Sequence, residues 1–404
     1  MAQPLKIIIF DGSFKTTAFI NRLAKGFAVD HQVYILGFNE NVSKKLRNVN
    51  YVPLGSNQNV LRFIITSLRY AMQAASAFFP TIIHLIKGDR QKLQQQNLRF
   101  ALDKIKPDII HLQWPSVLPW FEEELKMQNI PVILSQRGFH INVRPFVDKE
   151  NFAYLQTWYP KIAGFHSVSK AIAANGHKIW NAPEKIDKVV YTGLPLKEFP
   201  FSETYNRSEP LQLLSVGRTH WKKGYDYALQ SCKILKDKNI SFQYTIIGGA
   251  GEEELQFLVS DLGLEDCVNL VGRLSQVEVY GRMREASLLL MPSVEEGLPN
   301  VVVEAMALGL PVLSTNCGGV PELIEDGVDG WIVPIRNPEA MAEAVVAFYE
   351  LPLEKIEDVR VAARKKVETQ HNEERMIREM EALYRAVLER FLAEDAESNA
   401  EYTE

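Results

Sequence analysis

A pair of basic residues after an apolar run has the composition of an anion-binding turn. The run 211–216 indicates a buried strand, and Arg218 and Lys223 lie five positions apart in the turn that follows it and opens a helix. Gly224 lets the backbone approach a neighbour closely. Because Arg offers a planar fork of donors and Lys a compact charge, two such cations beside a helix N-terminus suit a diphosphate. A solvated basic turn would have the same sequence, so both interpretations stay open.

A second pair consists of two carboxylates, Glu296 and Glu304, which flank a predicted turn. The apolar run 286–291 indicates a buried parallel strand, and a helix is expected from Asn300, as its N-cap, to the C-cap Gly309. Such a helix begins at the carboxyl edge of a sheet, where backbone N–H groups and the helix dipole favour phosphate. Glu304 lies among apolar residues and is either a binding carboxylate or a surface residue of a half-buried helix.

Two glycine turns resemble phosphate loops only in part. Residues 248–251 read Gly-Gly-Ala-Gly, but three glutamates follow directly and would repel phosphate, so we expect a tight turn before a charged helix start. The turn at Gly12 and Ser13 follows the predicted strand 6–10 but lacks the G-x-G-x-x-G pattern, which argues against a dinucleotide site. Its place at the end of a strand still makes Gly12 and Ser13 candidates for substrate contact.

Composition limits the classes of protein that this chain can represent. A length of 404 residues predicts two domains, and a hydrophobic fraction of 46% is ordinary for globular cores. The net charge of −5 argues against a general nucleic-acid binder. Three scattered cysteines fit a reducing compartment and form no zinc pattern. We expect no signal peptide and no spanning helix, because residues 7–10 look like a strand and no run of 18 uncharged apolar residues occurs.

Residues 1–196 are predicted to form a doubly wound α/β domain. Strands are expected at 6–10, 33–36, 107–112, 131–135, 163–169 and 189–191, and helices at 16–29, 94–106 and 170–179. The binding crevice of such a domain lies at the carboxyl ends of its strands. The candidate residues at that edge are Asp11, Gly12, Ser13, Arg137, His140 and Ser169.

A polar segment, 197–210, is predicted to link this domain to a second βα series. The second domain covers 211–370, with strands at 211–216, 244–247, 268–271, 286–291, 311–314 and 330–333 and helices at 338–350 and 352–369. Residues 371–393 contain a long helix that starts near residue 372, and the acidic tail 394–404 is expected to be disordered.

The segment 60–92 differs from the rest of the first domain, because basic residues interrupt long apolar stretches. Two interpretations fit this pattern. The segment either forms helices that pack on the sheet, or presents a basic amphipathic surface that touches a membrane or a lipid-linked substrate.

The motifs of the second domain gain meaning when they are taken together and in order. They are Val216-Gly217-Arg218 with Lys223-Gly224, Pro292-Ser293 through Glu296 to Glu304, Gly309-Leu310-Pro311-Val312, Gly318-Gly319-Val320-Pro321-Glu322 and Asp329-Gly330. This series closely resembles family 4 of the retaining glycosyltransferases, with high specificity in 211–345 and a looser match in 1–195. The resemblance implies an α/β protein of GT-B architecture, with two Rossmann-like doubly wound parallel-sheet domains that face each other across a cleft. The helix in 371–393 would then cross back to the first domain.

The resemblance also implies roles for individual residues. Arg218 and Lys223 would grip the diphosphate of a nucleotide-sugar donor. Glu304 would bind the ribose diol, and Glu296 would bind hydroxyls of the donor sugar. Further contacts would come from Gly217, Arg273, Gly297, Leu298, Pro299, Asn300 and Val301. The implied reaction is hexosyl transfer with retention, in which the cations and the helix end stabilise a leaving phosphate that can itself accept the acceptor's proton. Because the chain has no Asp-x-Asp motif, we expect neither a metal nor a cofactor.

One position departs from the family pattern. Many members have His-Gly or His-Asp after the strand that corresponds to 131–135, with the His near the donor sugar. Here residues 135–141 read Ser-Gln-Arg-Gly-Phe-His-Ile, so Arg137 takes that place and His140 follows three residues later. Arg137 cannot act as a base at neutral pH, but it can clamp a phosphate or an acidic sugar. His140 can substitute for the missing His or simply pack.

The expected acceptor is a saccharide or a lipid-linked saccharide of a bacterial surface polysaccharide or glycolipid, with no nucleic acid as partner. The expected location is the cytoplasm, with peripheral contact to the inner face of the membrane through 60–92 as one option. Two rival functions share the same residues. A sugar-nucleotide epimerase or hydrolase of GT-B type would convert or cleave the donor without an acceptor. A non-catalytic subunit would bind the nucleotide sugar without turning it over.

Overall fold

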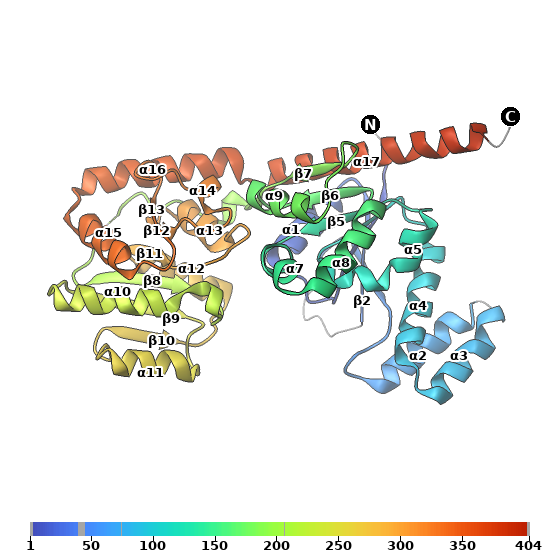
Figure 1. Ribbon diagram of the computed structural model, residues 1–404, viewed down its shortest axis with the longest axis horizontal. Helices are drawn as coiled ribbons and strands as arrows, with labels where there is room; N and C mark the ends of the chain where they lie inside the picture. Colours follow the sequence, from blue (N-terminus) through green and yellow to red (C-terminus); the bar gives the residue numbers. More distant parts are fainter. Residues whose placement is uncertain (1–2, 39–44, 74, 206, 402–404) are drawn as a thin grey trace. The chain divides into compact units, whose positions relative to one another are not determined.

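The computed structural model of the chain describes residues 3–38, 45–73, 75–205 and 207–401 (Figure 1). Contacts within the chain divide it into two compact units. Unit 1 consists of Met1–Val168, Ala173–Val190 and Met376–Glu404, and unit 2 of Ser169–Ile172 and Tyr191–Arg375. The C-terminal segment therefore belongs to the same unit as the N-terminal strands.

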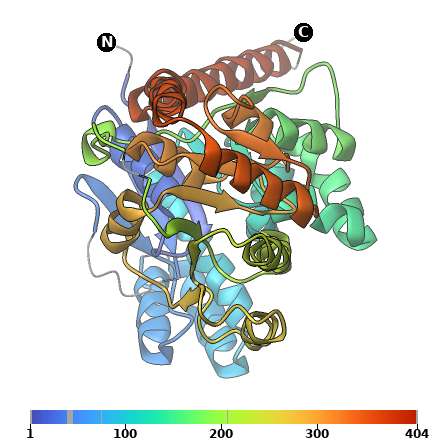
Figure 2. The same cartoon turned by 90° about the vertical axis from the view of Figure 1, so that its left-hand side faces the viewer.

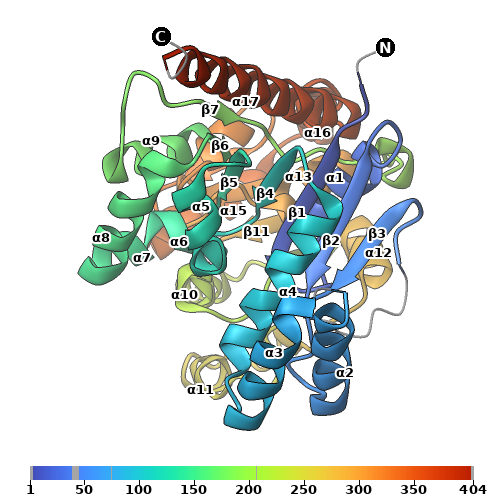
Figure 3. The same ribbon diagram turned by 90° about the vertical axis from the view of Figure 1, so that its right-hand side faces the viewer.

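Unit 1 is built around a sheet whose described strands are all parallel and follow the order β3-β2-β1-β4-β5-β6-β7 (Figure 3). The strands are β1 (Lys6–Gly12), β2 (Gln32–Gly37), β3 (Val49–Pro53), β4 (Ile109–Leu112), β5 (Val132–Gln136), β6 (Gly164–Ser167) and β7 (Asp187–Val189). Each of the six predicted strands overlaps a strand of the sheet, although β7 shares only Val189 with the predicted strand 189–191. The β3 strand was not predicted, because it lies at the sheet edge and none of its residues is fully buried.

Helices surround this sheet. They are α1 (Ala18–Phe27), α2 (Val60–Ala71), α3 (Ala75–Lys87), α4 (Arg90–Ile105), α5 (Glu122–Met127), α6 (Phe139–Asn142), α7 (Arg144–Val147), α8 (Lys149–Trp158), α9 (Lys170–Ile179) and α17 (Glu373–Glu401), with 3₁₀ turns η1 (Pro115–Trp120) and η2 (Tyr159–Lys161). Figures 1 and 3 both show α2, α3 and α4 grouped beyond the end of the strands. The sequence segment 60–92 therefore forms two helices and the start of a third.

The last helix contributes to the core of unit 1. Met376, Met380, Leu383, Tyr384 and Val387 of α17 pack in one buried cluster with apolar residues of β1, β2 and α1. The expectation of a disordered tail from 394 was wrong for the described part, since α17 continues to Glu401. The tail is rich in Ala and Glu, which favour helix, and Arg390 pairs with Glu394 at 2.6 Å one turn further on.

Unit 2 contains a second parallel sheet, in which the described strands follow the order β10-β9-β8-β11-β12-β13, as labelled in Figure 1. Figure 2 shows the same unit from another side. They are β8 (Leu211–Val216), β9 (Phe242–Ile247), β10 (Val268–Val271), β11 (Leu288–Met291), β12 (Val312–Thr315) and β13 (Trp331–Val333). All six correspond to predicted strands. Both units thus have the Rossmann-like, doubly wound form that was expected.

The two faces of this sheet are covered by different helices. Leu288 and Leu290 of β11 pack in one core, and Leu289 and Met291 pack in another, as the alternation of side chains along a strand requires. The first core includes α10 (Tyr225–Asp237), α11 (Glu253–Asp261) and α15 (Pro338–Glu350), and the second includes α12 (Gln276–Glu285), α13 (Asn300–Leu308), α14 (Val320–Leu323) and α16 (Leu353–Gln370). Burial on both faces explains why β11 is a continuous apolar run.

Candidate functional site

The ends of β8 and β11 bring one predicted cation and one predicted carboxylate into contact. Nζ of Lys223 donates to Oε1 of Glu296 at 2.6 Å, and Oγ of Ser293 donates to the same oxygen at 3.3 Å. The Lys223 and Glu296 side chains are 18% and 10% exposed. Because β8 and β11 are neighbours in the sheet, residues far apart in the sequence meet at its carboxyl edge. Lys223 is half-buried, and Glu296 is buried beside it at the strand ends.

Lys223 is placed by a tight turn that only glycine can complete. It ends the 3₁₀ turn η4 (Trp221–Lys223), and Gly224 follows with φ of +62° before α10 begins. A Cβ at Gly224 would lie 2.1 Å from the carbonyl oxygen of Pro292. The backbone N–H of Val294 also donates to the carbonyl of Lys222 at 2.7 Å. The two loops are therefore held together by backbone contacts, independently of the Lys223 side chain.

Two further glycines support the loop that carries Glu296. Gly318 has φ of +50°, and a Cβ there would lie 1.7 Å from the carbonyl oxygen of Glu296. The N–H of Gly319 donates to the carbonyl of Gly297 at 3.1 Å, and a Cβ at Gly319 would lie 2.3 Å from that oxygen. The Gly-Gly pair of the recognised motif thus serves as a close backbone support for 296–297.

The helix α13 begins one residue away from the predicted cap. Asn300 is its first helical residue, and the N-cap is Pro299, which makes no side-chain capping bond. The N-cap prediction was therefore wrong, since an extended Pro299 already turns the chain into the helix and Asn300 adopts helical geometry. The C-cap prediction is confirmed, because Gly309 has φ of +82°.

One face of α13 remains accessible, and it carries three predicted site residues. All residues from Val302 to Leu308 are buried except Glu304, and Asn300, Val301 and Glu304 are half-buried. Positions i and i+4 lie on the same face of a helix, so Asn300 and Glu304 project together. Glu304 is therefore placed beside the helix N-terminus and not on a face buried in the core.

The other predicted donor contacts surround this centre. Gly217 directly follows β8, and its carbonyl accepts from the hydroxyl of Tyr225 at 3.1 Å. Arg218 is exposed directly after it. Leu298 and Pro299 lie in the turn before α13, whereas Arg273 is exposed after β10, two strands away from β8 in the sheet. The sheet order thus places Arg273 outside the Lys223–Glu296 contact.

Two polar residues of this region were not singled out by the sequence. His220 lies between the two cations, and partial burial, followed by the nearby charges of Lys222, Arg218 and Lys223, lowers its pKa. A neutral imidazole therefore stands among these cations at neutral pH. Ser293 supports Glu296, as described above. Both lie in turns that follow strands of the sheet, and this position was the available signal.

In unit 1, Arg137 follows β5 at the carboxyl edge but its guanidinium is buried. It lies 3.9 Å from the ring centroid of Phe19 and 5.6 Å from that of Trp114. It donates to Oε1 of Gln113 at 3.0 Å and to Oγ of Ser135 at 3.1 Å. Burial lowers the pKa of Arg137 to about 9, so the group stays cationic at neutral pH. These contacts hold it firmly at the strand end.

A buried chain of hydrogen bonds lies beneath Arg137, and its direction can be worked out. Nε2 of His166 must donate to the carbonyl of Val190 at 3.0 Å, so its Nδ1 accepts from Ser135 at 2.8 Å. Ser135 then accepts from Nε2 of His111 at 2.8 Å, and Nδ1 of His111 accepts from the hydroxyl of Tyr384 at 2.6 Å. Burial, aided by Arg137, lowers the pKa of both histidines. Two neutral imidazoles therefore orient Ser135.

The remaining predicted residues of unit 1 lie at the same edge. Gly12 ends β1 with φ of +84°, and the N–H of Ser13 donates to Oδ1 of Asp11 at 2.9 Å. His140 is half-buried in α6, with its ring 5.9 Å from that of Trp114. The strand order β1-β4-β5 separates Gly12 from Arg137 by a single strand.

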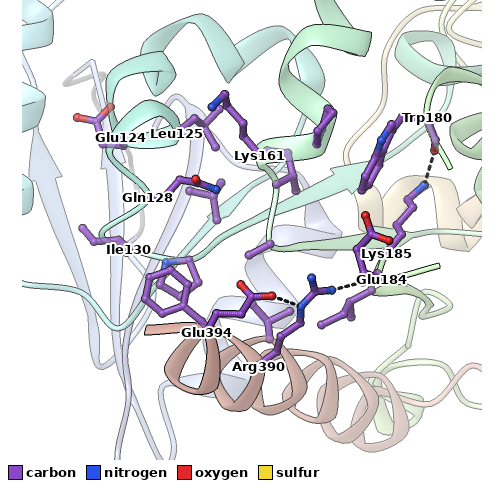
Figure 4. A pocket seen from close by; sticks show the side chains of 18 residues that line it. Glu124, Leu125, Gln128, Ile130, Lys161, Trp180, Glu184, Lys185, Arg390 and Glu394 are labelled. Carbon is purple, nitrogen blue, oxygen red and sulfur yellow. Dashed lines mark hydrogen bonds and ion pairs between the residues drawn. The ribbon is translucent and has the colours of Figure 1, made fainter. Parts of the chain in front are cut away.

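A cavity of about 400 Å³ lies elsewhere in unit 1, at the amino ends of β5, β6 and β7 (Figure 4). Arg390 lines it, donates to the carbonyl of Glu184 and pairs with Glu394. None of the predicted site residues lines this cavity. Within the described ranges, no group of three His, Cys, Asp or Glu could hold a metal ion, and no helix is long and apolar enough to cross a membrane.

Comparisons with known proteins point to one family. Residues 197–366, which contain Gly217 through Glu304, match the family described as glycosyl transferases group 1. The amylovoran biosynthesis glycosyltransferase AmsK of Erwinia amylovora is 39% identical over 315 residues, which are 76% of this chain and 73% of that protein. The putative colanic acid biosynthesis glycosyltransferase WcaL of Escherichia coli K12 is 37% identical over 185 residues, 44% of this chain and 46% of WcaL.

Solved structures support the fold. Sucrose-phosphate synthase from Thermosynechococcus elongatus superposes with a TM-score of 0.73 at 17% identity, over 96% of this chain and 99% of that one. Anabaena HepE, solved in complex with UDP and glucose, gives a TM-score of 0.70 at 16% identity, over 95% of this chain and 100% of that one. The similarity covers both Rossmann-like units, as in the GT-B architecture.

Proposed function

The chain belongs to the glycosyl transferases group 1 family, and we propose that it transfers a sugar, with retention, from a nucleotide-diphosphate donor to a hydroxyl of a saccharide or lipid-linked acceptor. The observation that carries this proposal is the contact between Lys223 and Glu296 beside the N-terminus of α13. It joins a phosphate-binding cation to a carboxylate that can accept hydroxyl hydrogens, at the end of a helix that favours anions. Together with Arg218 and Glu304, this is the chemistry of a nucleotide sugar.

The donor would exchange the contact between Lys223 and Glu296 for contacts of its own. Lys223 and exposed Arg218 would turn to the diphosphate, and Glu296 would accept hydrogen bonds from the sugar hydroxyls. Glu304 would bind the ribose diol from the accessible face of α13. Preorganised backbone around Gly297 would limit the reorganisation that the reaction requires.

We further propose that the chain works as a member of family 4, without a metal and without an enzymic nucleophile. Two cations and a helix dipole can stabilise the leaving phosphate, which takes the proton of the acceptor hydroxyl as the new bond forms. Arg137 or His140 would contact the donor sugar or the acceptor from unit 1. Relatives named for amylovoran and colanic acid synthesis favour a surface polysaccharide as the product, made in the cytoplasm where nucleotide sugars are available.

Product analysis tests this proposal. The full chain is incubated with a nucleotide sugar and candidate lipid-linked or free saccharides in EDTA, and proton NMR reports the anomeric configuration of the product. We expect transfer with the donor's configuration and no loss of rate in EDTA. Inversion, or activity that EDTA abolishes and Mg²⁺ restores, contradicts the retaining, metal-independent mechanism.

The same assay separates the two rival functions. An epimerase or hydrolase would convert or cleave the donor at the same rate when no acceptor is present. A non-catalytic subunit would bind the donor and turn it over in neither condition. We expect donor consumption that depends on the acceptor.

A further inference from the structure

The helices α2 and α3 carry an unusual concentration of exposed apolar side chains. Among the described residues, twenty large apolar side chains are exposed, and eight of them lie between Val60 and Ile86. Phe79 and Ile86 are 76% and 81% exposed. Scattered exposed apolar residues are normal in proteins, but such a cluster marks an interaction surface.

The spacing of these residues places them on one face of each helix. Leu61, Ile65 and Met72 recur along α2 and its C-cap at intervals of four and seven. Phe79, Ile83 and Ile86 recur along α3 at intervals of four and three. Intervals of three, four and seven correspond to a single helical stripe, so each helix presents a continuous apolar face outward.

The interior of the same helical group combines buried apolar side chains, such as Phe63, Leu93 and Leu98, with buried polar ones. Thr66, Ser67, Thr81 and Asn97 are buried where α2, α3 and α4 meet. Nδ2 of Asn97 donates to Oγ of Ser67 at 3.0 Å, and Nε2 of Gln96 donates to Oγ1 of Thr81 at 2.8 Å. Apolar packing and hydrogen bonds together therefore hold the helices, and the exposed apolar faces are not part of this interior.

The charged residues around these apolar faces indicate which kind of partner covers them. Residues 60–92 contain five Lys or Arg and one Asp, a net charge of +4 in a chain whose net charge is −5. Arg62, Arg69 and Lys87 are exposed and flank the apolar faces. Residues 75–86 contain no charged residue other than a histidine. Apolar faces bordered by Lys and Arg complement the apolar interior and the negative headgroups of an anionic bilayer.

We propose that the apolar faces of α2 and α3, termed the α2–α3 surface, dock on an anionic lipid bilayer. The 13 residues of α3 span about 20 Å, which is less than the ~30 Å of a bilayer's hydrocarbon core. The two helices therefore lie in the plane of the interface, with Phe79, Ile83 and Ile86 below the headgroups and Arg69 and Lys87 at their level.

The α2–α3 surface is attached to the edge of the unit 1 sheet where an acceptor is expected. The hydroxyl of Tyr70 donates to the carbonyl of Pro53 at 3.2 Å, at the end of β3, and Asn97 donates to the carbonyl of Leu54 at 3.1 Å. The carboxyl ends of β1 and β3 lie at the same edge of a parallel sheet. Docking there brings lipid-linked molecules within reach of unit 1. The docking itself does not rest on the transferase proposal.

Flotation of the full chain with vesicles tests the docking. Phosphatidylcholine vesicles are compared with vesicles that also contain phosphatidylglycerol, and the variant Phe79→Ser with Ile86→Ser is compared with a control, Phe257→Ser with Val277→Ser. The control removes two apolar residues of similar exposure, 67% and 79%, from unit 2. We expect the parent and the control to float with anionic vesicles only, and the α3 variant to bind at least about tenfold more weakly.

The basic residues are tested separately. Arg69→Gln and Lys87→Gln should each weaken binding to anionic vesicles by about fivefold, and added salt should weaken the parent in the same way. Unchanged melting temperatures would show that the variants fold. Equal flotation of the parent and the α3 variant overturns the proposal. The proposal is also overturned if the parent binds no vesicles and instead forms a concentration-dependent dimer that the α3 variant abolishes. A second copy of the chain would then cover the surface.

Discussion

At the scale of single residues, the contact between Lys223 and Glu296 makes the first prediction. Glu296→Gln keeps the size of the side chain but removes the charge that accepts from Lys223 and Ser293. We expect kcat for sugar transfer to fall by about 10²–10³, the usual loss when a preorganised electrostatic contact is removed. Lys222→Ala is the matched control, because it removes a neighbouring positive charge that does not touch Glu296. Equal kcat values for the two variants would exclude a role for Glu296.

Arg137 and His140 make a second prediction, in unit 1. Arg137→Ala removes the donor to Gln113, one of the two donors to Ser135 and the cation beside Phe19, so the free energy of unfolding should fall by about 3 kcal/mol. Half-buried His140 can be replaced by Ala at a smaller cost. Urea titration measures both. Transfer assays under conditions where each variant is folded then report the role in the site, and full activity in both variants removes the site assigned to unit 1.

The buried histidines predict how stability depends on pH. Burial lowers the pKa of His111 well below 6.5 and that of His166 to about 3, so below pH 6.5 the unfolded chain binds more protons than the folded one. The free energy of unfolding should therefore have its full value above pH 6.5. Below pH 6.5 it should fall by about 1.4 kcal/mol per pH unit for each of these histidines. His371, whose pKa burial lowers to about 4, adds to this slope.

Urea titration between neutral pH and pH 5 measures the slope. The slope measured for His166→Gln should be smaller than the parent's by the contribution of one histidine. This holds whatever the effect of the substitution on stability at neutral pH. A parent whose stability does not change over this range would contradict the buried neutral histidines.

At the scale of elements, the glycine support of the 296–297 loop makes a fourth prediction. Gly318→Ala adds a Cβ that meets the carbonyl oxygen of Glu296 at 1.7 Å, so the loop must move. Gly327→Ala is the control, since Gly327 also has positive φ (+74°) but nothing lies within 4 Å of its Cβ. Both lose about 1–2 kcal/mol through strained φ, but only Gly318→Ala should also weaken donor binding, by more than about tenfold. Calorimetric titration with the donor distinguishes them.

The sequence predicted those elements whose burial leaves a clear pattern. β1 and β11 are covered on both faces and read as continuous apolar runs. β3 has no fully buried residue, so its Val-Asn-Tyr-Val-Pro sequence carries no comparable signal. The end of α17 was missed because composition suggested disorder, whereas local helix propensity and the Arg390–Glu394 pair favour helix. Single-residue caps such as Pro299 depend on local dihedral angles that composition does not determine.

At the scale of the whole molecule, the sequence predicted two Rossmann-like sheets and the residue types of the site, but not how its residues meet. Lys223 and Glu296 are 73 positions apart, and their contact depends on β8 and β11 being neighbours in the sheet. The backbone support from Gly318 likewise depends on β12 following β11 in the sheet order. Arg137 was assigned from a family motif, and neither its burial nor the histidine chain beneath it could be predicted from local sequence.

The most direct test of the account is whether the intact chain binds a nucleotide sugar through unit 2. Melting temperatures are measured in EDTA with UDP-, GDP- and ADP-sugars, for the parent and for Arg218→Ala with Lys223→Ala. A ligand at 100 times its dissociation constant stabilises the folded state by about 2.7 kcal/mol, which corresponds to a rise of a few degrees. We predict such a rise for the parent with at least one of these donors and none for the double variant. Absence of any rise in the parent at millimolar donor, or an equal rise in the double variant, would contradict the assignment of the donor site to unit 2.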